Sequence, residues 1–367
     1  MKYRYNIIKL ICLTALLTAA GCQSEMLVDY QEQTQTQNSG KAIDFVGGFI
    51  DNMFRTRATT MLSQHSATMG VWGWQTTLEE GEVKLFDNQN VYYSDELQDW
   101  TYSPKKYWAS DSEYRFYAYA PHSTSVEDAV VSIDPESGKF SIEGVTLEGS
   151  NLQQENPSAK TSGIFADVTD VDWMIDRVGL TELKGGTSGN RVTFNMQHIL
   201  AKLNVLVRLN SALADDERIT VTLDSLKIGS FIGNGTFVQK YDRTPDPTDA
   251  DNYPEQEWTS DLTKPGYLIS SAEDVEIDGK GLYVIESLVI PQQTSADSKI
   301  RVYYTISTTD GHAERYYEVF SLDEAFTGFA TGHNYTLTLT IAPDYITFDA
   351  GSDSWDENNV SAGNTIE

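Results

Sequence analysis

The chain has 367 residues and a formal net charge of −28, because 54 Asp and Glu residues outnumber 26 Lys and Arg residues. A surface this acidic repels nucleic acid and anionic lipid, which argues against a phosphate-binding role and against nucleic acid as a partner. A charged fraction of 22% and an aromatic fraction of 11% indicate a folded protein rather than a disordered acidic chain, and the length is enough for two domains.

The first 21 residues have the features of an export signal. A basic start precedes an apolar run from Ile7 to Leu17 and a small-residue end, and the run is too short to span a membrane. The final residues, Ala19-Ala20-Gly21-Cys22, resemble a bacterial lipobox, although Ala19 stands where the pattern prefers Leu. This resemblance predicts that Cys22 becomes the lipidated first residue, anchored by acyl chains such as palmitate. The alternative is a plain signal peptide with a chance cysteine. No other cysteine follows Cys22, so disulfides and thiolate sites are excluded from the body.

Residues 22–57 are predicted to form a tether and a removable leader. The stretch 23–40 is rich in Gln, Thr and Ser and cannot form a core. An apolar segment, 42–54, follows, and two arginines end it.

Within that segment the pattern is ambiguous between strand and helix, and Gly47-Gly48 favours the strand. In a strand, four apolar side chains would share one face: Ile43, Phe45, Phe49 and Met53. We expect this strand to be released by cleavage after Arg57, before Ala58, with Arg55 as a second candidate site, because open polar connections are readily cut. An ordinary first element followed by surface arginines is the alternative.

From residue 58 onward, short alternating segments separated by turn residues predict an all-β fold. The segments 69–77, 113–121 and 335–341 alternate most clearly, and a strand is also predicted at 100–108. A change of parity before Leu226 and Ile228 predicts a bulge. The Gly- and Ser-rich stretch 181–190 predicts a boundary between two β-sandwich domains, 58–187 and 188–367.

The sequence contains no recognisable catalytic or metal-binding motif. The five histidines have no metal-ligand spacing, and no nucleophile, phosphate-binding or dinucleotide motif is present, so we predict no catalytic residue, no metal and no cofactor. A β-sandwich glycosidase with paired carboxylates is the third hypothesis. Four tryptophans in the first half could bind a glycan or a protein, but in a sandwich they more often fill the core. They are Trp72, Trp74, Trp100 and Trp108.

Seven stretches, in order along the chain, resemble the fimbrillin family, the type V pilins of certain Gram-negative bacteria. They are Arg57–Thr60, Met69–Trp72, Trp100–Trp108, Tyr114–Pro121, Val192–Val205, Leu288–Gln292 and Gly332–Leu337. The resemblance spans Cys22 to Trp355 and implies a pilus subunit, or an associated tip or anchor protein, with two tandem transthyretin-like (Greek-key) sandwiches.

The resemblance also implies how such a subunit assembles. The precursor would be an outer-membrane lipoprotein until an Arg-specific protease removes the leader and its strand. This removal would open a long apolar groove. A strand from another pilin subunit, often its C-terminal end, would then fill the groove, and the product would serve adhesion in a cell-surface fimbria. The candidate donor residues here are Ile346, Phe348 and Trp355, although the tail after Phe348 is acidic. The alternative is a permanently anchored surface lipoprotein that acts as a tip, an anchor or a binding module.

Overall fold

In the computed structural model of the chain, the described residues are 41–47, 68–79, 81–126, 129–147, 171–176, 181–184, 191–240, 254–260, 267–270 and 274–355. They belong to one compact unit that starts at Lys41. Apart from the short helix α2 (Ser211–Ala214) and the 3-10 turns η2 (Ser123–Ser125) and η3 (Leu322–Glu324), their regular elements are strands, so the predicted all-β class is confirmed. None of the helices in the described ranges is long and apolar enough to cross a membrane.

The first large sheet has seven strands in the order β11-β8-β5-β2-β3-β4, with β9 paired to β5. These strands are β2 (Thr68–Thr77), β3 (Gly81–Ser94), β4 (Asp99–Thr101), β5 (Glu113–Ala120), β8 (Met174–Asp176), β9 (Thr181–Lys184) and β11 (Met196–His198). Both faces of its centre are buried: Val71 and Phe116 belong to one apolar cluster, whereas Trp72 and Tyr117 belong to another. The predicted alternation of β2 and β5 is therefore confirmed.

A four-stranded sheet, β15-β14-β7-β6, packs against the second of those faces. It consists of β6 (Val130–Asp134), β7 (Lys139–Thr146), β14 (Asn234–Lys240) and β15 (Glu255–Ser260). The rings of Tyr117 and Phe140 lie 4.5 Å apart across this layer. Since β14 follows residue 188 and yet pairs with β7, sheet pairing crosses the position at which the domain boundary is predicted. That boundary stays a prediction.

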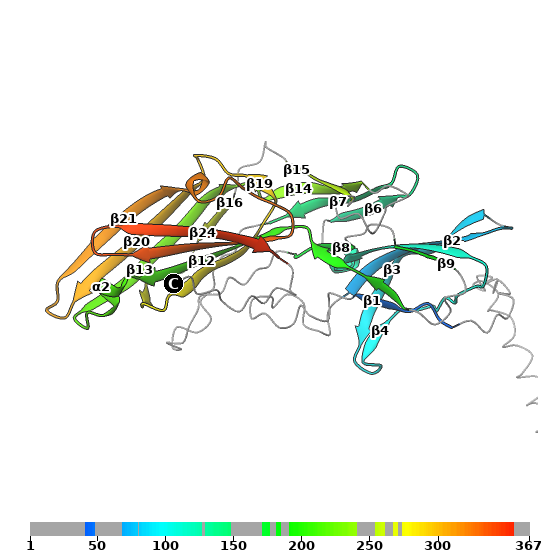
Figure 1. The fold of residues 1–367 in the computed structure, drawn as a ribbon, viewed down its shortest axis with the longest axis horizontal. Helices are drawn as coiled ribbons and strands as arrows, with labels where there is room; N and C mark the ends of the chain where they lie inside the picture. Colours follow the sequence, from blue (N-terminus) through cyan, green and yellow to red (C-terminus); the bar gives the residue numbers. More distant parts are fainter. Residues whose placement is uncertain are drawn as a thin grey trace, which may run out of the picture. The chain divides into compact units, whose positions relative to one another are not determined.

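A four-stranded sheet and a five-stranded sheet form a sandwich around an aliphatic core (Figure 1). One sheet runs β18-β12-β23-β24, and the other runs β16-β13-β20-β21 with β17 on β13. Their bounds are β12 (Ala201–Leu209), β13 (Ile219–Phe231), β16 (Tyr267–Ser270), β17 (Val275–Ile277), β18 (Leu282–Val289), β20 (Lys299–Thr308), β21 (Ala313–Ser321), β23 (His333–Ile341) and β24 (Ile346–Ser354). Two small sheets complete the fold: β1 (Phe45–Gly47) with β10 (Val192–Phe194), and β19 (Gln292–Gln293) with β22 (Gly328–Phe329).

Two details of the sequence pattern are reproduced and one is not. In β23 the apolar residues Tyr335, Leu337 and Leu339 are buried, and the threonines between them are half-exposed. The register of β13 against β20 shifts between Leu223 and Ser225, where the bulge is predicted. The strand expected at 100–108 ends at Thr101, because Pro104 has no N–H to donate to a ladder, and a loop follows.

Candidate functional site: the seat of the first strand

The first described segment, residues 41–47, contains β1 and pairs in parallel with β10. Phe45 lies opposite Val192, and Gly47 lies opposite Phe194. The Val192 amide donates to the Asp44 carbonyl oxygen over 2.8 Å. Since β10 lies nearly 150 positions later in the chain, this pairing depends entirely on the tertiary fold.

On its other side the same segment is bonded to the loop that follows β4. The Ile43 amide donates to the Lys106 carbonyl oxygen over 2.9 Å, and the Trp108 amide donates to the Lys41 carbonyl oxygen over 3.2 Å. Ala42 and Tyr107 form an antiparallel bridge. The segment therefore lies as an inserted strand, bonded through its backbone to a partner on each side.

The inward side chains of the segment are fully buried. Ile43 is 0% exposed and Phe45 is 1% exposed, whereas Asp44 and Val46 between them are half-buried. The predicted strand parity of Ile43 and Phe45 matches this arrangement. Phe49 and Met53, the other members of the predicted face, lie outside the described residues.

Four aromatic rings surround Phe45. We call these rings the seat, because they receive the inward side chains of residues 41–47. The ring centroids are 5.2 Å away for Phe86, 5.4 Å for Tyr102, 5.6 Å for Phe116 and 5.8 Å for Phe194. Such edge-to-face and stacked contacts add to the free energy of burial. Gly73 makes room for two of them, because a Cβ there would lie 2.8 Å from the Phe86 ring and 2.9 Å from the Phe116 ring.

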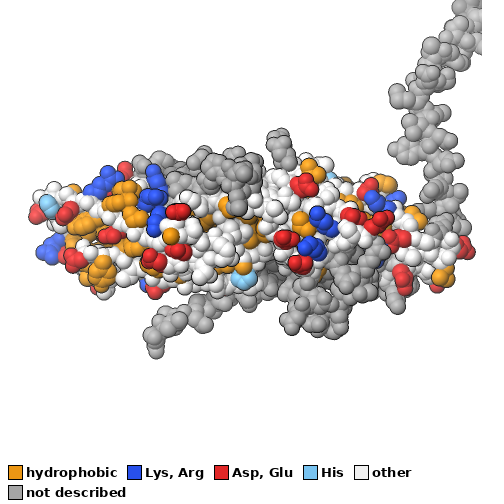
Figure 2. Space-filling model, turned by 90° about the horizontal axis from the view of Figure 1, so that it is seen from above, with side chains coloured by type: hydrophobic (Ala, Val, Ile, Leu, Met, Phe, Trp, Pro, Cys, Tyr) orange, Lys and Arg blue, Asp and Glu red, His pale blue; other side chains and the backbone are white. Residues whose placement is uncertain are grey.

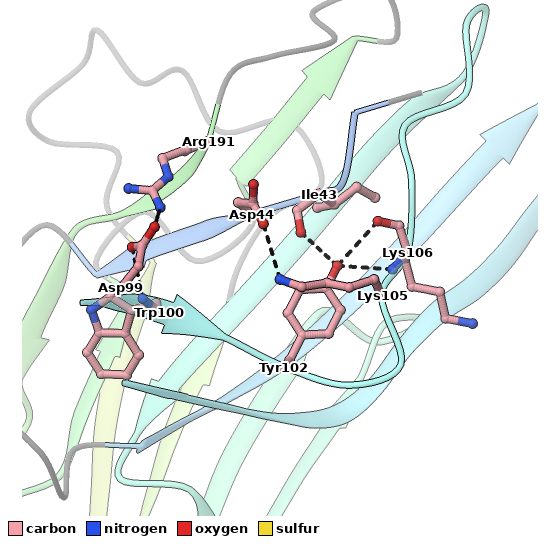
Figure 3. Close-up of polar contacts among 8 residues, drawn as sticks. All are labelled: Ile43, Asp44, Asp99, Trp100, Tyr102, Lys105, Lys106 and Arg191. Carbon is pink, nitrogen blue, oxygen red and sulfur yellow. Dashed lines mark hydrogen bonds and ion pairs between the residues drawn. The ribbon is translucent and has the colours of Figure 1, made fainter. Parts of the chain in front are cut away.

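The Tyr102 hydroxyl connects the seated segment to the loop (Figure 3). It donates to the Ile43 carbonyl oxygen over 2.7 Å and accepts from the Lys106 amide over 3.2 Å. Burial of the phenol is the main cause that raises the pKa of Tyr102 to about 12. The neutral hydroxyl is thus the form that the folded seat stabilises.

Charged residues border the seat without forming it. Lys105 Nζ lies 3.3 Å from Asp44 Oδ1 (Figure 3). Arg191, the residue before β10, pairs with Asp99, the first residue of β4. These pairs are about one-third or more exposed, and exposed pairs contribute little to stability. The seat is therefore held mainly by apolar burial and main-chain hydrogen bonds.

The candidate donor residues lie at the end of the described chain. Ile346 is 8% exposed and Phe348 is half-buried, with its ring 5.8 Å from that of Phe320. From Asp349 to Ser354, β24 is exposed. Trp355 stacks on the buried His198 ring at 3.7 Å, and its amide donates to the Gly332 carbonyl oxygen over 2.7 Å.

The other predicted sites have simpler outcomes. Cys22, Arg55, Arg57 and Ala58 lie outside the described residues. Trp72, Trp74, Trp100 and Trp108 are only 4–5% exposed, so they are packing residues, as expected. In the described part of the chain, no group of three or more His, Cys, Asp or Glu side chains could hold a metal ion. Sequence reasoning missed the role of Tyr102, whose only signal was its place in the aromatic stretch 100–108.

Replacing Phe45 with Ala should loosen the seat selectively. Truncating a buried Phe costs about 3–5 kcal/mol, so the seated segment should open more often. In the full chain, hydrogen exchange at the Ile43 and Val192 amides should become much faster. Val46→Ala is the matched control, because this side chain is half-buried and points away from the rings. Equal exchange in the two variants would contradict the proposed anchoring by Phe45.

The Tyr102 hydroxyl should make stability depend on pH. Its pKa is raised from 10.0 to about 12 in the folded protein, so its contribution is complete below pH 10 and is lost as the pH rises to 12. Tyr102→Phe removes the hydrogen bonds of the hydroxyl to Ile43 and Lys106, at a cost of about 1–3 kcal/mol below pH 10. Denaturant titrations should show the gap between wild type and variant closing above pH 10. A gap that stays constant to pH 12 would show that the hydroxyl is not responsible.

The sequence profile of the fimbrillin-like family matches residues 56–355. No match was found among curated protein sequences.

Among solved structures, a fimbrial protein from Bacteroides vulgatus is 16% identical with a TM-score of 0.47; the match covers 78% of this chain and 92% of that one. The tip fimbrial protein Mfa3 from Porphyromonas gingivalis, C-terminally truncated, is 10% identical with a TM-score of 0.31, over 80% and 96% of the two chains. The family match covers most of the 367 residues. The chain therefore belongs to the fimbrillin-like family, whose members are structural pilus proteins rather than enzymes, and its role is that of a fimbrial subunit at the cell surface.

Proposed function

We propose that the chain is exported as an outer-membrane lipoprotein on Cys22 and is then processed into an adhesive pilus subunit. In this proposal an Arg-specific protease cuts between Arg57 and Ala58, and residues 42–54 leave the fold. A strand of another subunit takes their place in the seat. The observation that carries the proposal is the inserted position of residues 41–47, which are bonded to separate chain segments on both sides.

The position of the seat along the chain supports its removal. The seated residues lie before the family match, which begins at residue 56. A cut after Arg57 would separate them from the rest of the fold without interrupting any described strand of the main sheets.

An emptied seat would be a strong acceptor for a strand. Departure of residues 41–47 would break the hydrogen bond that the Lys106 carbonyl accepts from Ile43 and the one that the Val192 amide donates to Asp44. It would also uncover the four rings around Phe45. Unpaired main-chain N–H and C=O groups beside an apolar groove are a template for strand addition. An extended segment with alternate apolar side chains would both form the main-chain hydrogen bonds and cover the rings.

The C-terminal strand has the side-chain spacing that the seat requires. Ile346-Thr347-Phe348 repeats the Ile-x-Phe spacing of Ile43-Asp44-Phe45. In addition, β24 is an edge strand whose described pairing is to β23 alone, so its release would break a single ladder. These features favour Ile346 and Phe348 as the donor pair, with Trp355 further along the same strand end.

The alternative function, a permanently anchored binding lipoprotein, has less support. It relied on aromatic side chains of the first half, and Trp72, Trp74, Trp100 and Trp108 are nearly fully buried. A tip or anchor subunit that accepts a strand without donating one is a variant of the main proposal.

Cleavage is tested with the full chain in detergent and an Arg-specific protease. The new N-terminus should be Ala58, and Arg57→Ala should abolish that cut because the protease requires arginine before the scissile bond. Arg55→Ala is the matched control and should be cut as wild type. N-terminal sequencing reads the result. Resistance of the folded wild-type chain at both arginines would refute the removable leader and leave the anchored lipoprotein as the better proposal.

Strand donation is tested on the cleaved product. Wild type should form an SDS-resistant ladder on an unboiled gel, and Phe348→Glu should abolish the ladder without affecting cleavage, because a buried charge is costly. Thr347→Glu is the control, since this neighbour lies on the opposite face of the strand and is exposed. A ladder that survives Phe348→Glu would exclude β24 as donor. A clean cut without any wild-type ladder would indicate a subunit that only accepts a strand.

A further inference from the structure

The outer face of the β13-β20-β21 sheet has an unusual set of side chains for so acidic a chain. Alternate residues of β20, such as Val302 and Tyr304, are buried in the core, so the residues between them point outward. Cross-strand pairing places Arg301 beside both Lys227 and Val319, and Tyr303 beside Tyr317. We call this surface the cationic face; it comprises Lys227, Lys299, Arg301, Tyr303, Arg315 and Tyr317.

The tyrosines of the cationic face are partly exposed, and they contact each other and a neighbouring arginine. The rings of Tyr303 and Tyr317 stack at 4.4 Å, and the Arg315 guanidinium lies 5.7 Å from the centre of the Tyr303 ring. Tyr317 is 49% exposed, and the adjacent Val319 is 43% exposed. In Figure 2, hydrophobic side chains lie between Lys and Arg side chains at the end of the molecule that carries β20 and β21. Tyrosine and arginine are the residues that dominate protein interfaces.

The charges on the cationic face are poorly neutralised from within. Among the described residues, Asp224 pairs with Arg315 over 2.8 Å and accepts from the Thr305 hydroxyl. A second carboxylate, Glu276 of β17, lies opposite Thr222 in the same sheet. Within the described ranges, no ion pair joins Lys227, Lys299 or Arg301 to a carboxylate. Like charges on neighbouring strands repel one another. The face therefore gains from negative charge supplied by another molecule.

We propose that the cationic face binds the acidic surface of a second copy of this chain, as a side-by-side contact separate from strand exchange. The face is the outer side of a β-sheet, and such a surface suits a macromolecular partner, whereas small ligands bind in concave sites. A second copy is complementary because the chain carries −28 overall while this face is positive. At physiological salt the Debye length is about 8 Å, so repulsion between the two net charges is screened while contacts at the face persist.

The contact is heterologous, because a basic face on one copy meets an acidic surface on the next. Contacts of this kind repeat without closing and produce open arrays unless rotation closes a ring. Side-by-side association of subunits or fibres is the expected consequence. This inference does not depend on cleavage or on the donor strand.

Photo-cross-linking of the intact chain tests the contact. Tyr317 is replaced by a photoreactive phenylalanine analogue in full chains that also carry Arg55→Ala and Arg57→Ala, so that no strand exchange can start. Isotopically light and heavy copies are mixed at physiological salt, and cross-linked peptides are identified by mass spectrometry. Light–heavy cross-links from position 317 to an acidic segment are the expected result.

Arg301→Glu should reduce the yield of those cross-links by about tenfold, the order of effect of a central interface residue. Arg208→Glu is the matched control, because Arg208 is exposed on β12 in the other sheet of the same sandwich, and its yield should match wild type. Arg301→Glu also relieves like-charge repulsion, so the fold should persist, as circular dichroism can verify.

Two results would overturn the proposal. The first is the absence of light–heavy cross-links from position 317, or a yield that Arg301→Glu leaves unchanged. The second is binding of soluble polygalacturonate at the cationic face in place of the second copy, which would make it a polysaccharide site.

Discussion

Main-chain hydrogen bonding on both sides of residues 41–47 is the constraint on which the proposed assembly depends. The segment is hydrogen-bonded to the 106–108 loop and to β10, and the ring of Phe45 packs among the four aromatic rings of the seat. Its loss would therefore leave two kinds of deficit at once, unpaired polar groups and uncovered rings. In the proposed assembly, another extended segment with alternating apolar side chains would satisfy both, so removal of one strand would be coupled to addition of the next.

The rest of the fold can keep its shape during such an exchange because the sheet under the seat is supported from behind. Phe116 faces Phe45, whereas its neighbour Tyr117 packs on Phe140 of the second sheet. That second sheet includes β14 and β15, which arrive from much later in the chain. The face opposite the seat is therefore covered by contacts that leader removal does not touch.

Much of the secondary structure was predictable because a half-buried strand imposes a period of two on its sequence. The alternation of 335–341 and the bulge in β13 followed from side-chain parity alone. The segment 100–108 was predicted wrongly as one strand, because its aromatic residues suit both a strand and a loop packed on a core. The crossing of β14 and β15 to the sheet of β7 could not be predicted, since short strands carry no signal for their partners.

For the candidate site, side-chain parity predicted that Ile43 and Phe45 share a face, and the order of short motifs indicated the fimbrillin family. Ile43 and Phe45 are buried on that face. The residues that receive them could not be read from the sequence, because Tyr102, Phe116 and Phe194 come from three separate stretches of the chain. Side-chain periodicity is a local property of the backbone, whereas an apolar seat exists only where distant segments are brought together by folding.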